Sequence, residues 1–219
     1  MIGGMTVTPL EMRNERYAPL VVKNLCSRGF DACYVRTRAE ALEQSLAWIP
    51  QGALVGWGGS LSVAQIGLLD AVRSTHPVLD RDAAASEEAR QECMRQSLLC
   101  DVFLTGSNAI SEDGRLINMD GNGNRVAALT FGPRRVIVVA GMNKVVPNVE
   151  AGIERIRTVA GPVNMMRFIK SDSKTACSVT GVCRNCNAPD CICNSLVITR
   201  RCRPAGRIKV LLVGEELGI

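Results

Sequence analysis

The chain has 219 residues, of which 47% are apolar and 21% charged, a composition typical of one globular domain with a substantial core and not of a disordered protein. Its net charge of +5 is a mild excess, and aromatic residues make up 4%, so the dense basic stripe of a nucleic-acid-binding protein is absent and no nucleic-acid partner is expected. The first 16 residues include Glu11 and Glu15 and no apolar run, so neither an export signal nor a membrane span is expected. We therefore expect a cytoplasmic protein whose thiols stay reduced.

Apolar periodicity predicts helices and strands in alternation along the chain. Thr8 before Pro9 is typical of a capped helix start, with Gly29 at the end of that helix and Pro19 kinking or dividing it. The segment from Thr37 contains a capping box. In chain order, we predict strands at 30–35, 53–57, 78–79, 102–105, 136–140, 196–199 and 208–213, and helices at 37–49, 61–72, 86–99 and 148–159.

The alternation of strands with helices of this length predicts an α/β fold with a mainly parallel sheet and helices on both faces. Segment 136–140 has five consecutive apolar residues, which indicates a strand buried on both sides. We expect a single domain over residues 1–219. A cysteine-rich loop, residues 175–195, interrupts the pattern just before the last two predicted strands.

This loop holds five of the ten cysteines within 17 residues, spaced C-x5-C-x2-C-x4-C-x-C. Thiolates are soft ligands that suit zinc or iron–sulfur clusters, and disulfides are disfavoured in a reducing compartment. The spacing matches neither the paired C-x2-C knuckles of zinc ribbons nor the C-x2-C-x2-C run of ferredoxins, so iron–sulfur, zinc and unreactive thiols without a metal all remain open. The five cysteines are Cys177, Cys183, Cys186, Cys191 and Cys193.

Three polar loops follow predicted strands, where ligands bind in open α/β sheets. Gly58, Gly59 and Ser60 could present free N–H groups to an anion, or could form a plain turn in which Ser60 caps the next helix. Lys144 follows the strand at 136–140 and could neutralise an anion, or could be a solvated surface lysine.

The third polar loop, residues 105–125, carries two hairpin signals, Asp113-Gly114 and Asp120-Gly121. It also holds more hydrogen-bonding side chains than turns require, which indicates contact with a ligand, here a small carboxylate metabolite. Its predicted ligand-contacting residues are Asn108, Asn118, Asp120, Asn122, Asn124 and Arg125.

Several of these segments, taken in order, resemble the lactate-utilisation (LUD) domain family, the family that includes the lactate utilisation protein C group. The resemblance implies a fold like that of sugar-phosphate isomerases and CoA transferases, a bacterial or archaeal cytoplasm, and a link to the oxidation of lactate to pyruvate. It rests on Gly56-Trp-Gly-Gly-Ser60, Leu68-Leu-Asp70, Asp101-Val-Phe-Leu-Thr105, Asn108-Ala-Ile110, Asp120-Gly-Asn-Gly-Asn-Arg125, Gly141-Met-Asn-Lys144, Thr180-Gly-Val-Cys183 and Cys193-Asn194.

The family resemblance implies Cys177, Cys183, Cys186 and Cys193 as the metal ligands, with Cys191 standing where the family pattern has another residue. It favours an iron–sulfur cluster, of the 4Fe–4S type, with zinc as the alternative. The expected protein is an oxidoreductase subunit or electron-transfer component that acts with redox partner subunits on lactate or a related hydroxy acid. The alternative is a zinc-stabilised isomerase- or transferase-like protein acting on a small anionic metabolite. The sequence identifies no catalytic base.

Overall fold

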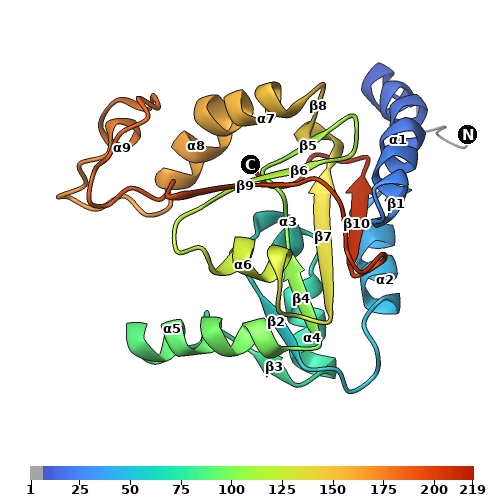
Figure 1. Ribbon diagram of the computed structural model, residues 1–219, viewed down its shortest axis with the longest axis horizontal. Helices are drawn as coiled ribbons and strands as arrows, with labels where there is room; N and C mark the ends of the chain where they lie inside the picture. The colour runs from blue at the N-terminus through green and yellow to red at the C-terminus, as the bar shows by residue number, and fades with distance from the viewer. Residues whose placement is uncertain (1–6) are drawn as a thin grey trace, which may run out of the picture.

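The computed structural model describes residues 7–219; residues 1–6, part of the segment read for an export signal, lie outside the described residues. A six-stranded sheet, parallel at every pairing, forms the centre of the molecule (Figure 1). This confirms the predicted α/β fold. In spatial order its strands are β1 (Asp31–Val35), β10 (Ile208–Val213), β7 (Arg135–Gly141), β4 (Val102–Thr105), β2 (Val55–Trp57) and β3 (Val78–Leu79).

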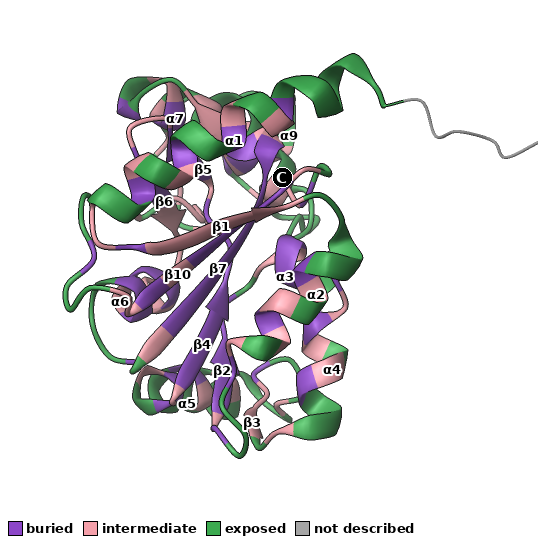
Figure 2. Ribbon diagram, turned by 90° about the vertical axis from the view of Figure 1, so that its right-hand side faces the viewer, coloured by how far each residue is buried: buried purple, intermediate pink, exposed green. Residues whose placement is uncertain are grey.

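Strand β7 lies between β10 and β4, and residues 136–140 are fully buried on both faces of the sheet (Figure 2). Val136 and Val138 join an apolar cluster on one face, whereas Ile137 and Val139 join a second cluster, with Trp57, on the other. Successive side chains of a strand point to opposite faces, so an unbroken apolar run is what a central parallel strand requires.

Helices cover both faces of the sheet (Figure 2). One cluster takes apolar residues from α1 (Pro9–Ser27) and α6 (Asn124–Thr130). The opposite cluster takes residues from α2 (Arg38–Ala47), α3 (Leu61–Gln65) and α4 (Leu68–Thr75). Helix α5 (Glu87–Gln96) continues into a 3₁₀ turn, Ser97–Leu99, beside β2.

Local sequence signals predicted where helices begin better than they predicted whether a helix continues unbroken. Both capping boxes form, at Thr8 and Thr37. Pro19 does not divide α1; it lies on the exposed side of the helix, where water can replace a lost backbone hydrogen bond. The single helix predicted at 61–72 is wrong: α3 ends at Gln65, and Gly67, with φ 76°, starts α4.

A second, four-stranded sheet was not predicted. Within it β5 (Ala109–Ser111) and β6 (Leu116–Asp120) form the hairpin expected at Asp113-Gly114. Gly114 adopts φ 85°, and a Cβ there would lie 2.6 Å from the backbone of Asn24. The hairpin predicted at Asp120-Gly121 is wrong, because the chain there leads from β6 into α6 through Gly123, at φ 82°. In spatial order this sheet contains β8 (Val145–Val146), β5 (Ala109–Ser111), β6 (Leu116–Asp120) and β9 (Ser195–Thr199).

The helix expected at 148–159 is α7 (Val149–Arg155), which continues through a π-helical turn, Ile156–Ala160, into α8 (Gly161–Met165). Gly161 donates its N–H to the carbonyl of Ile156, five residues earlier, and the next residue, Pro162, has no N–H to donate. The cysteine-rich loop follows α8, contains α9 (Ala176–Thr180), and extends to one side of the molecule (Figure 1). Over residues 7–219, no helix has the length and apolar character needed to span a membrane.

Candidate functional site at the strand ends

A cleft of about 1160 Å³ lies where β2, β4 and β7 reach their C-terminal ends. The chain segments that follow these strands supply one wall, and α8 with the cysteine-rich loop supplies the other. Nine of the ten residues predicted from sequence to contact a ligand line this cleft, and Asn118 is buried behind it. The nine are Gly58, Gly59, Ser60, Asn108, Asp120, Asn122, Asn124, Arg125 and Lys144.

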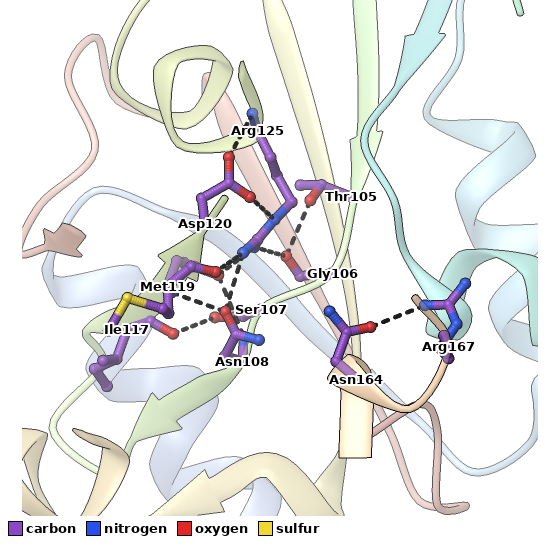
Figure 3. A network of polar contacts seen from close by, with 11 residues as sticks. Thr105, Gly106, Ser107, Asn108, Ile117, Met119, Asp120, Arg125, Asn164 and Arg167 are labelled. Atoms are coloured by element: carbon purple, nitrogen blue, oxygen red, sulfur yellow. Dashed lines mark hydrogen bonds and ion pairs between the residues drawn. The ribbon is translucent and has the colours of Figure 1, made fainter. Parts of the chain in front are cut away.

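Arg125, which is 7% exposed, organises the polar wall of the cleft (Figure 3). Burial lowers the pKa of its guanidinium, and Asp120 opposes that shift. All five of its side-chain N–H groups are donated within the protein, so Arg125 positions the cleft residues and offers no free donor to a ligand. The acceptors are Asp120 Oδ1 (3.1 Å), Asn118 Oδ1 (2.6 Å), Gly106 O (3.3 Å), Asn108 Oδ1 (3.0 Å) and Met119 O (2.7 Å).

Two side-chain amides of the cleft wall keep donors free for a ligand. Asn108 Oδ1 accepts hydrogen bonds from Met119 N (2.9 Å) and from Arg125, so its Nδ2 group has no partner among residues 7–219. Asn124, the first residue of α6, also lines the cleft, and its side chain makes no hydrogen bond to another described residue. Two amide groups therefore face the cleft with donors to spare.

Lys144 is 5% exposed, so the alternative of a solvated surface lysine is wrong. Its Nζ lies 3.0 Å from Oγ of Ser62. Burial, followed by the guanidiniums of Arg155 and Arg125, lowers the pKa of Lys144 from 10.5 to about 7. Neither Ser62 nor Arg155 was predicted as a site residue, because nothing in their local sequence distinguishes them from ordinary helix residues.

Replacing Lys144 with methionine is expected to raise the free energy of unfolding at about pH 7, by on the order of 3 kcal/mol. The unfolded chain binds a proton at this lysine up to a pKa of 10.5, whereas the folded chain releases it near 7. The free energy of unfolding of the wild type should therefore rise with pH between these two pKa values. The difference between it and the free energy of unfolding of Lys144→Met should shrink over the same range. Urea unfolding of both proteins at about pH 7 and about pH 9 measures both effects. A difference in unfolding free energy that does not change with pH would contradict the lowered pKa of Lys144.

The five clustered cysteines all line a second, much smaller cavity of about 50 Å³, here called the thiol cavity. Burial raises the pKa of Cys193 to about 12, and the neighbouring thiols of Cys191, Cys183 and Cys177 add to the shift. Among residues 7–219, no three His, Cys, Asp or Glu side chains stand close enough together to hold one metal ion. Five soft donors around one cavity nevertheless fit the chemistry of a thiophilic metal, and Cys191 is not set apart from the other four.

The cleft and the thiol cavity share a wall. Met119 and Ile192 line both of them. Asn194 fixes the loop against β6, since its backbone N–H donates to Asp120 O (2.9 Å) and its side chain to Gly121 O (3.0 Å). The cysteine-rich loop is therefore part of the cleft and not a separate appendage.

Comparison with known proteins gives a family and a fold. A family model described as the LUD domain matches residues 18–213. The solved structures that match include the crystal structure of a DUF162 family protein from Deinococcus radiodurans, with a TM-score of 0.54 and 16% sequence identity, covering 91% of this chain and 98% of that chain. At this identity the likeness shows the fold alone. No curated protein matches.

Proposed function

Because the chain belongs to the LUD domain family, we propose that it is a metal-binding component of the oxidation of lactate or a related small hydroxy acid in a bacterial or archaeal cytoplasm. The cleft binds the anionic metabolite, and the thiol cavity holds an iron–sulfur cluster. The observation that supports this pairing is the shared wall: Met119 and Ile192 line both cavities. A cluster held there would accept electrons beside the metabolite site and pass them to a redox partner subunit.

The groups left free in the cleft suit a carboxylate. Asn108 Nδ2 and the side chain of Asn124 donate hydrogen bonds, and Lys144 supplies a cation when protonated. A few converging polar groups in a larger cleft are typical of metabolite sites.

In the thiol cavity, Cys177, Cys183, Cys186 and Cys193 are the proposed ligands, with Cys191 as an alternative to Cys193. A 4Fe–4S cluster held there supplies one-electron transfer, at a potential set by its burial and by hydrogen bonds to its sulfurs.

The small volume of the thiol cavity, about 50 Å³, favours a second candidate. A single zinc ion carries no redox chemistry and needs four thiolates at about 2.3 Å, so the thiols would have to draw closer together around it than they stand here. It would tie the loop to β6, and the cleft would then do isomerase- or transferase-like work on a small anion.

Purification without oxygen tests the two candidates. A brown protein with a broad visible absorption band and with iron and sulfide in equal amounts supports the redox function. A colourless protein with stoichiometric zinc overturns the redox function in favour of the second candidate.

Replacing Asn124 with alanine is expected to weaken binding of lactate or pyruvate by about threefold to tenfold, the loss of one hydrogen bond to a charged or polar partner. Isothermal titration calorimetry measures the affinity. Gln91→Ala, on the exposed surface of α5, is the matched control and should bind as the wild type does. Equal affinities in the wild type and Asn124→Ala would place the carboxylate elsewhere.

A further inference from the structure

The amine of Lys144 is held in a close-fitting enclosure made by three segments distant in sequence. It follows β7, and its Nζ lies 3.0 Å from Oγ of Ser62 in α3. The third segment passes over both groups at Gly218, where a Cβ would lie 2.8 Å from Nζ and 2.7 Å from the Ser62 hydroxyl. Gly218 also has φ 64°, which favours glycine, so the backbone can approach this closely and fix the amine in place.

The charges around this amine are unusual for a buried lysine. Buried lysines are normally paired with a carboxylate, yet Lys144 takes part in none of the ion pairs formed by residues 7–219. The charged side chains that act on it are two cations, Arg125 from α6 and Arg155 from α7. Ile219, the last residue, also lines the cleft, and its O accepts a hydrogen bond from Arg155 Nη1 at 3.3 Å. Ser62, from α3, is uncharged. Arg155 is itself fixed, since its Nη1 donates to Asn108 O at 2.7 Å.

This environment keeps the amine in its neutral form near neutral pH, and a neutral amine is a nucleophile. Desolvation and a neighbouring cation are the two means by which proteins activate lysine for attack on carbonyl groups. Desolvation and a neighbouring cation both favour the uncharged form of a lysine, so neither would help a lysine whose only role is to attract an anion.

We propose that Lys144 forms a Schiff base with the carbonyl group of a 2-oxo acid whose carboxylate is held by Asn108 and Asn124. The class of ligand rests on the proposed function, since oxidation of a 2-hydroxy acid yields a 2-oxo acid. The reactive carbonyl adjoins the carboxylate in such an acid. Both the amine and the two amides line the same cleft.

The step needs no oxidant or reductant. The nitrogen lone pair attacks the carbonyl carbon, a C–N bond forms, and the carbonyl π pair moves to oxygen, which takes a proton. A second proton lets that oxygen leave as water while the C=N bond forms; the two protons are balanced by the two that the amine nitrogen gives up as it becomes a neutral imine. Ser62, 3.0 Å from Nζ, is placed to relay these protons and acts as a positioning residue.

Trapping the adduct tests the proposal. The full-length protein is incubated with pyruvate, treated with borohydride, and analysed by intact mass and peptide mapping. One reduced adduct is expected on Lys144 in the wild type and in Lys23→Arg, which alters an exposed lysine of α1 that does not line the cleft. It should be absent from Lys144→Arg. An unmodified protein, or label confined to other lysines, would overturn the proposal.

The pH profile gives a readout that a structural lysine would not produce. Because attack needs the neutral amine and its pKa is about 7, the labelling rate should rise about tenfold between pH 6 and pH 8 and then level off. Ser62→Ala should slow labelling without abolishing pyruvate binding. A rate that climbs steadily to pH 10, as for a surface lysine, would contradict the assignment.

Calorimetry on the same preparations separates this inference from the proposed function. Lactate has no carbonyl group beside its carboxylate and cannot form the adduct. If lactate and pyruvate both bind and no adduct forms, only the Schiff base is overturned. If neither acid binds, the proposed function fails, and the Schiff base with it.

Discussion

Replacing Arg125 with methionine is expected to lower the free energy of unfolding by about 3–5 kcal/mol, the cost typical of breaking a buried ion pair from one side. The side chain is 7% exposed and donates five hydrogen bonds. Removing it leaves the carboxylate of Asp120 without its 3.1 Å partner, with Asp120 itself only 13% exposed at its side chain. It also removes the 2.6 Å donor of the buried Asn118 side-chain oxygen, which keeps only the Asn108 N–H at 3.2 Å.

Urea unfolding followed by circular dichroism measures the loss, and Arg134→Met is the matched control. The Arg134 side chain is 88% exposed and lies 3.8 Å from Asp101, so its replacement should change stability by less than about 0.5 kcal/mol. A similar small change in Arg125→Met would mean that the network contributes little to the fold. In that event, the cleft wall would be held by the two sheets alone.

The double replacement of Cys183 and Cys186 with serine is expected to abolish metal retention. These are two of the four proposed ligands, and two remaining thiolates leave no closed site. Removal of an outer-shell partner alone commonly weakens metal binding about 10–100-fold, so loss of two ligands should exceed that range. Metal content after anaerobic purification and desalting measures the effect.

The matched control replaces two thiols outside the cysteine-rich loop, Cys26→Ser with Cys93→Ser, and should retain the wild-type metal content. A third variant, Cys191→Ser, should also retain metal if Cys193 is the fourth ligand. Full metal content in Cys183→Ser/Cys186→Ser would show that the ligands are wrongly assigned. Loss of metal in Cys191→Ser with retention in Cys193→Ser would exchange the two roles.

The regular elements of the fold could be predicted well from sequence, because their causes are local. The buried run at 136–140 predicted the central strand, and the capping boxes at Thr8 and Thr37 marked two helix starts. What failed was continuity over Gly67, where one backbone angle divides a helix whose apolar periodicity is unbroken. Periodicity reports which face is buried and carries no information on a single left-handed residue.

The second sheet shows that local sequence also does not determine which strands pair with one another. Its outer strand β9 pairs antiparallel with β6, 75 or more residues earlier in the chain, and not with the main sheet. The sequence indicates that residues 196–199 form a strand, but the partner of a strand is chosen by long-range packing. For the same reason Asp120-Gly121, a hairpin signal taken alone, became the passage from β6 to α6.

By itself, the sequence determined the α/β class, the strand ends at which polar residues gather, and the cluster of five cysteines. Only the tertiary structure decided that nine of those polar residues line one cleft, and that the cysteine-rich loop closes its side. It also decided the surroundings of two basic side chains: all five N–H groups of Arg125 are bonded to acceptors, and Lys144 is buried beside two arginines. Charge and hydrogen-bonding capacity belong to a residue type, whereas desolvation and the distance to other charges arise only when remote segments pack together.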